Sequence, residues 1–195
     1  MTTSASQLYK KISTYDSFVS KEDIQKAYNF SKKAHTNQFR GSGEEYFTHP
    51  LAVANYLTEM KLDASSIMTA LLHDVVEDCE ITIQNINDEF GSEIAKLVDG
   101  VTKLSKLDLK FGFAQAENFR KLLFASSDDI RVLLVKLADR LHNIRTINGI
   151  KDDTKRSKIC YETLEIFAPL AERLGINAIQ RELEDRCFAV LKPET

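Results

Sequence analysis

Ile67-Met68-Thr69-Ala70-Leu71-Leu72-His73-Asp74-Val75-Val76-Glu77-Asp78 joins an apolar run directly to four side chains that bind metals or carry protons. A continuous helix turns by about 100° per residue, which would gather these four side chains within an arc of about 140°. Ionised carboxylates in apolar surroundings are costly unless a positive charge lies beside them, and a bound divalent cation supplies that charge. The segment therefore predicts a helical metal centre with acid/base groups beside it, which is typical of a metallohydrolase.

The composition of the whole chain predicts one globular domain over residues 1–195. The chain is 43% hydrophobic and 28% charged, enough for a sizeable core. Its formal net charge of −3 argues against a general nucleic-acid binder. No run approaches the roughly 18–20 apolar residues that cross a bilayer, and the first residues lack a signal-peptide core. We therefore expect no membrane segment and a cytoplasmic location.

Helical periodicity covers nearly the whole chain, which contains three prolines and seven glycines. Apolar spacing and capping residues, among them Ser20, Asp63, Thr82 and Ser92, mark the predicted elements. Helices are expected over about 21–36, 48–60, 64–78, 82–91, 92–104, 114–126, 128–147, 154–173 and 177–190. A loop, or a short hairpin, is expected over 105–113. The fold class predicted is all-α, a single bundle of about eight to ten helices.

The segment over 128–147 has apolar residues on both faces of its predicted helix. One stripe consists of Ile130, Leu133, Leu134, Leu137, Leu141 and Ile144. Val132 and Val135 lie on the opposite side, close to the direction of Asp139. A helix that is apolar on both faces is expected at the centre of the fold, so Asp139 should be buried or half-buried.

Asp139 has two readings that spacing alone does not separate. It is either a metal ligand or one half of a buried salt bridge with Arg140 or Arg145. Asn143 and Thr146 follow it by four and seven positions and share its face.

His49 follows a glycine-bearing loop and begins a predicted helix. A single histidine in such a position is more often a capping or surface residue than a ligand. It becomes a candidate ligand if His73 shares a metal with a second imidazole.

Several separated blocks of the sequence resemble the HD-superfamily hydrolase domain of the RelA/SpoT alarmone enzymes, over roughly residues 20–194. The blocks occur in the family's order and are Ala34-His35, Gln38-Phe39-Arg40, Ser42-Gly43-Glu44, Tyr46, His49-Pro50-Leu51-Ala52-Val53-Ala54, Ala70 to Asp78, Leu97 to Leu104, Val135 to Thr146 and Glu162 to Ala171. The number and order of these matches make the resemblance far more specific than the His-Asp pair alone.

The resemblance implies a set of metal ligands and catalytic residues. The RelA/SpoT hydrolases hold one Mn²⁺ through residues that match His49, His73, Asp74 and Asp139. The acidic pair that acts on water in the family matches Glu77 and Asp78. On this resemblance, Asp139 is expected to be a ligand rather than a salt-bridge partner.

The resemblance also implies the substrate and its binding residues. The family's hydrolase removes pyrophosphate from the 3′ position of ppGpp or pppGpp, leaving GDP or GTP. Residues that surround the guanosine part of the substrate match Arg40, Ser42, Asn143 and Thr146.

Two departures from the family pattern affect this expectation. Gly41 stands where many family hydrolases carry a lysine, so one substrate contact is expected to be missing or supplied elsewhere. Long family members continue into a synthetase domain, whereas this chain stops near the start of their linker, which fits a free-standing hydrolase or an excised or degenerate N-terminal domain.

Two other functions remain open on the sequence. One is an HD phosphohydrolase of another nucleotide, such as NADPH. The other is a module that binds alarmone without cleaving it, against which the intact Glu77 and Asp78 count. The preference between ppGpp and pppGpp and the formation of homo-oligomers stay open at this point.

Overall fold

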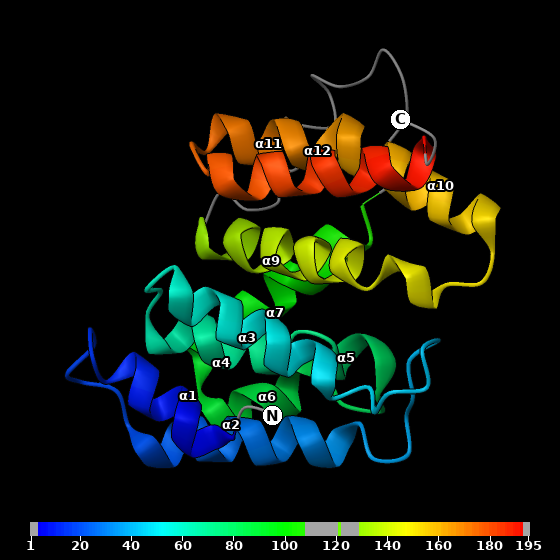
Figure 1. Ribbon diagram of the computed structural model, residues 1–195. Helices are drawn as coiled ribbons and strands as arrows, with labels where there is room; N and C mark the ends of the chain where they lie inside the picture. The colour runs from blue at the N-terminus through cyan, green and yellow to red at the C-terminus, as the bar shows by residue number, and fades with distance from the viewer. Residues whose placement is uncertain (1–3, 108–120, 122–128, 193–195) are drawn as a thin grey trace.

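A computed structural model describes residues 4–107, 121 and 129–192 (Figure 1). The described helices are α1 (Ala5–Ile12), α2 (Lys21–Ala34), α3 (Thr48–Glu59), α4 (Ala64–Leu72), α5 (Val75–Asp78), α6 (Ile83–Phe90), α7 (Ser92–Ser105), α9 (Arg131–Arg145), the 3₁₀ turn η1 (Ile147–Gly149), α10 (Asp153–Glu162), the π-helical segment η2 (Thr163–Phe167), α11 (Ala168–Arg173) and α12 (Asn177–Leu191). Within these residues the extended structure is limited to an isolated bridge between Phe39 and Glu45. The all-α prediction is confirmed.

Side-chain caps set the starts of several helices, because they satisfy backbone N–H groups that the first turn leaves unpaired. The side chains of Ser20, Asp63 and Thr82 accept hydrogen bonds from backbone N–H groups at the starts of α2, α4 and α6, as predicted. The prediction that Ser92 caps the next helix is wrong. Helix α7 begins at Ser92 itself, after Gly91 with a φ of 85° and without a side-chain cap.

Helix α9 lies at the centre of the molecule, as its two apolar faces predicted (Figure 1). It packs against α3, α4 and α7 on one side and against α12 on the other. Val132 and Val135 are buried, and so are Leu133, Leu137 and Leu141. Residues of α9 that carry polar side chains are therefore held by packing from several directions.

One predicted element has a different form in the structure, and another lies outside the described residues. The helix expected over 154–173 is interrupted by the π-helical segment η2, and Pro169 lies in the first turn of α11. Proline has no N–H to give and its ring clashes with the carbonyl four residues earlier, so a widened turn before it accommodates the chain. The helix expected over 114–126 lies outside the described residues except for position 121, and so does the loop beyond Leu107.

Helix α1 was not anticipated from the sequence. Ser4 and Gln7 form a capping box at its start, and Leu8 and Ile12 enter the core with no exposed surface. None of the described helices is long and apolar enough to span a bilayer.

The close approach of α7 to α9 at Gly100 gives a test of the packing. A Cβ atom on Gly100 would lie 2.8 Å from Cγ2 of the buried Val132. Alanine in place of glycine normally stabilises a helix by about 1 kcal/mol, but overpacking a core costs about 1–3 kcal/mol. We expect Gly100→Ala to lower the free energy of unfolding, measured in urea, by up to about 2 kcal/mol, which is the overpacking cost less the helix gain. With Val132→Ala in the background, the added methyl should cost nothing; a stabilising Gly100→Ala in the wild type would contradict the packing.

Candidate metal centre and adjoining pocket

His73 and Asp74 occupy a break between α4 and α5, so the single helix predicted over 64–78 is wrong. Nδ1 of His73 donates to the carbonyl oxygen of Ala70 at 2.7 Å. In a continuous helix that carbonyl would accept from the N–H of Asp74. The imidazole thus takes over a backbone acceptor at the point where the helix ends. The arc calculated for one helix does not apply, and the break brings both side chains toward the same space.

The four predicted ligands meet at this break. His49 comes from the first turn of α3 and Asp139 from the middle of α9. Nε2 of His49 lies 3.1 Å from Oδ1 of Asp139 and 3.5 Å from Oδ2 of Asp74. Nε2 of His73 lies 3.0 Å from Oδ1 of Asp74 and 3.9 Å from Oδ1 of Asp139. Ligand atoms of His49, His73 and Asp74 all lie within 4.8 Å of one another.

The donor set fits a divalent cation. His73 is 1% exposed, and its buried Nε2 has no hydrogen-bond partner among the described residues. Nδ1 of His73 is bonded to a carbonyl oxygen and keeps its proton, so Nε2 is the ring atom that would bind a cation. Without a cation, burial lowers the pKa of His73, but Asp74 and Asp139 raise it well above its usual value and the ring is charged. Two imidazole nitrogens and two carboxylates suit Mn²⁺, Fe²⁺ or Zn²⁺. The cluster therefore implies a divalent metal without selecting one ion.

His142 holds the second imidazole in place. Its Nδ1 lies 2.7 Å from Nδ1 of His49. Burial, followed by the positive charges nearby, lowers the pKa of His142 to about 3, so this ring is neutral at pH 7. A neutral His142 can accept the Nδ1–H of His49, and in that tautomer Nε2 of His49 is unprotonated toward the cluster, as metal binding requires.

The two carboxylates of the cluster are stabilised as anions even without a metal. Burial raises the pKa of Asp74, but the charge of His73, its hydrogen bond and the charge of His49 together bring that pKa to about 2. Burial also opposes ionisation of Asp139, but Lys136, His49 and His73 together hold the pKa of Asp139 well below its usual value.

The contacts of Asp139 combine the two interpretations left open by the sequence, a salt-bridge partner and a metal ligand. Nζ of Lys136 donates to Oδ2 of Asp139 at 2.7 Å, while Oδ1 faces the imidazoles. The predicted salt-bridge partners are engaged elsewhere, Arg140 with Glu162 and Arg145 with Glu182. Asp139 is therefore one half of a salt bridge and a member of the candidate metal cluster at the same time.

The candidate catalytic acids lie beside the cluster. Asp78 accepts a hydrogen bond from the hydroxyl of Tyr46 at 2.6 Å, and the same hydroxyl lies 3.1 Å from Oδ2 of Asp74. Burial raises the pKa of Glu77, although Ser105 and the charge of Lys136 act in the opposite direction. A carboxylate with a raised pKa is a stronger base, as a group that deprotonates water requires.

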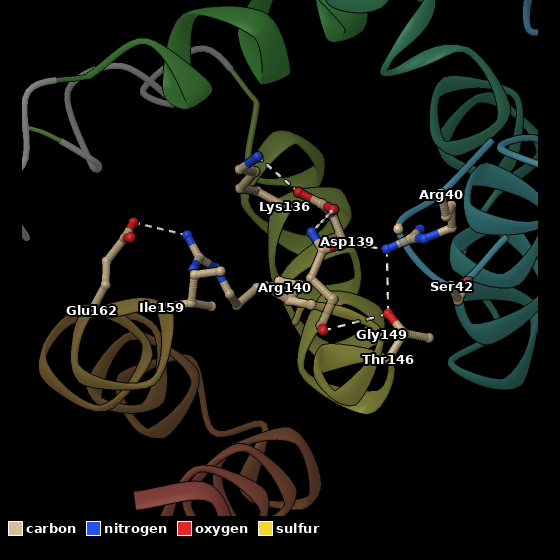
Figure 2. A pocket seen from close by; sticks show the side chains of 12 residues that line it. Arg40, Ser42, Lys136, Asp139, Arg140, Thr146, Gly149, Ile159 and Glu162 are labelled. Atoms are coloured by element: carbon tan, nitrogen blue, oxygen red, sulfur yellow. Dashed lines mark hydrogen bonds and ion pairs between the residues drawn. The ribbon is translucent and has the colours of Figure 1, made fainter. Parts of the chain in front are cut away.

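The predicted substrate residues line one pocket of about 290 Å³ next to the cluster. Figure 2 shows Lys136, Asp139 and Arg140 on α9, with Arg40 and Ser42 on one side and Glu162 of α10 on the other. Arg40 donates through Nη2 to Oδ1 of Asn143 at 3.1 Å and to Oγ1 of Thr146 at 3.2 Å.

Asn143 also connects the pocket to the metal cluster. Its Nδ2 donates to Oδ1 of Asp139 at 2.7 Å. Arg40, Ser42, Asn143 and Thr146, chosen by resemblance, are thus brought together by the fold, and a single side chain separates Arg40 from Asp139.

Sequence reasoning assigned no role to Lys136 or Tyr46. Lys136 precedes Asp139 by three positions on one helix, a spacing that places ion pairs on a common face, so it could have been found. Tyr46 precedes α3, and its contacts with Asp74 and Asp78 span 28 and 32 residues. No local pattern predicts contacts of that range.

Comparison with known proteins identifies the family to which this fold belongs. Residues 27–177, which include all four candidate ligands, match the family described as "HD domain". The chain belongs to the HD-domain family. A match of this length covers α3, α4, α5 and α9, the helices from which the cluster is built.

Named relatives of this HD domain are much longer proteins. Guanosine-3′,5′-bis(diphosphate) 3′-pyrophosphohydrolase of Vibrio cholerae is 51% identical over 173 residues, which are 88% of this chain and 24% of that protein. Bifunctional (p)ppGpp synthase/hydrolase SpoT of Escherichia coli K12 is 53% identical over 171 residues, 87% of this chain and 24% of that protein. GTP pyrophosphokinase of Myxococcus xanthus is 53% identical over 175 residues. The chain spans about a quarter of the length of these curated relatives.

One solved structure shares the fold. It is described as a metazoan orthologue of SpoT that hydrolyses ppGpp, and it aligns with a TM-score of 0.64 at 22% identity. The alignment covers 90% of this chain and 97% of that one. The helical HD-domain architecture is confirmed by this likeness.

The charge balance at Asp139 predicts a stability effect in metal-free protein. Removing one partner of a buried ion pair leaves the other charge uncompensated and typically costs about 3–5 kcal/mol. We expect Lys136→Met to lower the free energy of unfolding in chelator by this amount, and Asp139→Asn in that background to recover much of it. The control Lys26→Met removes a half-exposed pair with Glu89 and should cost less than about 1 kcal/mol. Equal losses in the two lysine variants would contradict the assignment.

The His142 contact predicts an effect on metal affinity. Hydrogen-bond partners of ligating histidines commonly contribute about 10–100-fold to metal affinity or activity. We expect His142→Phe to weaken Mn²⁺ binding, measured by titration calorimetry, within this range while the protein stays folded. Unchanged affinity would show that His142 does not orient His49.

Proposed function

We propose that this HD domain is a metal-dependent hydrolase that removes pyrophosphate from the 3′ position of ppGpp or pppGpp, leaving GDP or GTP. The observation that carries the proposal is the position of Asp139. Its Oδ1 lies in the cluster with His49 and also accepts from Asn143, which reaches Arg40 in the pocket. This arrangement supports a substrate that binds with its nucleoside in the pocket and a phosphate group next to the cluster.

The proposed cofactor is Mn²⁺, held by His49, His73, Asp74 and Asp139. Nitrogen and oxygen donors without thiolate suit this ion, and the resemblance to RelA/SpoT hydrolases favours it over Zn²⁺ and Fe²⁺. When bound, a divalent cation offsets negative charge on the reacting phosphate and makes water easier to deprotonate.

The proposed division of labour follows from the residues around the cluster. Glu77, whose pKa is raised by burial, accepts a proton from the attacking water, and Asp78 orients that water. Arg40 supplies positive charge to the pocket, and its guanidinium is held in place by Asn143 and Thr146. Ser42 lines the same wall. A local cationic field thus attracts a polyanionic substrate to a chain with negative net charge.

The named relatives support this choice of substrate over other nucleotides. Two proteins with ppGpp hydrolase names match this chain at 51% and 53% identity. We further propose that residues 1–195 act as one catalytic domain in the cytoplasm. The alternative substrate NADPH makes a distinct prediction, because its cleavage releases orthophosphate rather than pyrophosphate.

Incubation with labelled ppGpp tests the proposal. With Mn²⁺, the wild-type chain should form GDP and pyrophosphate in equal amounts, and chelator should stop the reaction. Asp74→Ala should lose both Mn²⁺ binding and turnover. Glu77→Gln should keep Mn²⁺ binding and lose about 10²–10⁴-fold in rate. Full hydrolysis by Glu77→Gln would refute its role, and orthophosphate release from NADPH with no action on ppGpp would replace the proposed substrate.

A further inference from the structure

Tyr46 joins the candidate metal cluster to the candidate catalytic acids. Its hydroxyl donates to Oδ2 of Asp78 at 2.6 Å and lies 3.1 Å from Oδ2 of Asp74. A phenol carries one proton, so the shorter contact with Asp78 is the principal bond. Burial and the two carboxylates raise the pKa of Tyr46, which therefore stays protonated and remains a donor.

Asp78 needs an external partner to stay in place. It is the last residue of α5, a helix of four residues, and it is exposed. Its carboxylate and that of Asp74 repel each other, so a donor shared between them offsets this repulsion. If the Tyr46 hydroxyl is removed, its hydrogen bond to Asp78 is lost, and the repulsion from Asp74 favours rotation of the Asp78 carboxylate toward solvent.

The segment that carries Tyr46 is itself rigidly held. The Tyr46 ring stacks on the buried His35 with centroids 4.8 Å apart and an interplanar angle of 26°. The backbone N–H of Tyr46 donates to the carbonyl of Gln38 at 2.9 Å. Gln38 in turn bonds to His35 and, through Nε2, to the backbone carbonyl of Asp78 at 3.1 Å. Asp78 is therefore bonded by Gln38 at its backbone carbonyl and by Tyr46 at its side chain.

Tyr46 does not belong to the residues that line the substrate pocket. An effect on substrate affinity is thus not expected from its hydroxyl. The contact with Asp78 instead places the hydroxyl where it controls the orientation of a group that acts on water.

We propose that Tyr46 is a positioning residue that fixes the Asp78 carboxylate beside the metal cluster, so that its hydroxyl contributes to turnover through Asp78 and not to substrate binding. This inference rests on the proposed function, since it assigns Asp78 to the reacting water.

The test compares the wild type with Tyr46→Phe, which removes the hydroxyl and keeps the ring stacked on His35. We expect kcat for pyrophosphate release from ppGpp to fall by about 10–100-fold, with KM changed less than about twofold. Mn²⁺ affinity, measured by calorimetry, should change less than about threefold, because the bond to Asp74 is the longer one. In a crystal structure of Tyr46→Phe, the Asp78 carboxylate should have turned away while Asp74 and both imidazoles keep their places.

Tyr15→Phe is the matched control, because it also removes one phenol hydroxyl, bonded to the carbonyl of Leu62, and should leave kcat unchanged. In an Asp78→Asn background, Tyr46→Phe should add less than about a twofold loss, as expected for two residues acting as one unit.

Three outcomes would overturn the inference. They are an active Tyr46→Phe with unchanged kcat, an Asp78 carboxylate that does not move, and a loss of rate that saturating Mn²⁺ restores, which would mean that Tyr46 acts through Asp74. If the wild type fails to cleave ppGpp, the proposed function fails instead, and the crystal structures still decide whether Tyr46 fixes Asp78.

Discussion

The structure depends on keeping two carboxylates ionised inside a bundle of helices. Asp139 is 4% exposed in the middle of α9, which is packed on both sides, and Asp74 lies at the break between α4 and α5. Burial opposes both charges. Lys136 compensates Asp139, and the imidazoles of His49 and His73 face both acids. A divalent cation would complete this balance and would bind Nε2 of His73, a buried atom with no hydrogen-bond partner in the part of the chain that the structure describes.

The same charges organise the surroundings of the cluster on two sides. On one side, Asn143 donates a hydrogen bond to Asp139 and accepts one from Arg40, which fixes the pocket wall. On the other side, the Tyr46 hydroxyl lies between the carboxylates of Asp74 and Asp78 and contacts Asp78, one of the candidate catalytic acids. Asn143 uses its two amide atoms, and Tyr46 uses one hydroxyl, which donates to Asp78 and lies 3.1 Å from Asp74. The site is therefore one connected polar network held by apolar packing around it, and a change at either end is expected to be felt at the centre.

Much of the fold could be predicted from local pattern. Caps at Ser20, Asp63 and Thr82 located helix starts, and the two apolar faces around Asp139 identified the central helix. The break at His73 could not be predicted, because it depends on a side chain taking the carbonyl of Ala70 from the backbone. Two of the candidate ligands, His49 and Asp139, required the family resemblance, since periodicity left Asp139 undecided and gave His49 little weight. Contacts such as that of Tyr46 with Asp78 join segments far apart in the sequence, so no local pattern predicts them.

The central claim is that His49, His73, Asp74 and Asp139 share a single cation. Crystals grown with Mn²⁺ and measured at the manganese absorption edge test it most directly. The account predicts one anomalous peak within bonding distance of Nε2 of both histidines and of a carboxylate oxygen of both aspartates. A peak bound elsewhere on the protein, or a cluster that stays free of manganese at saturating concentration, would contradict it.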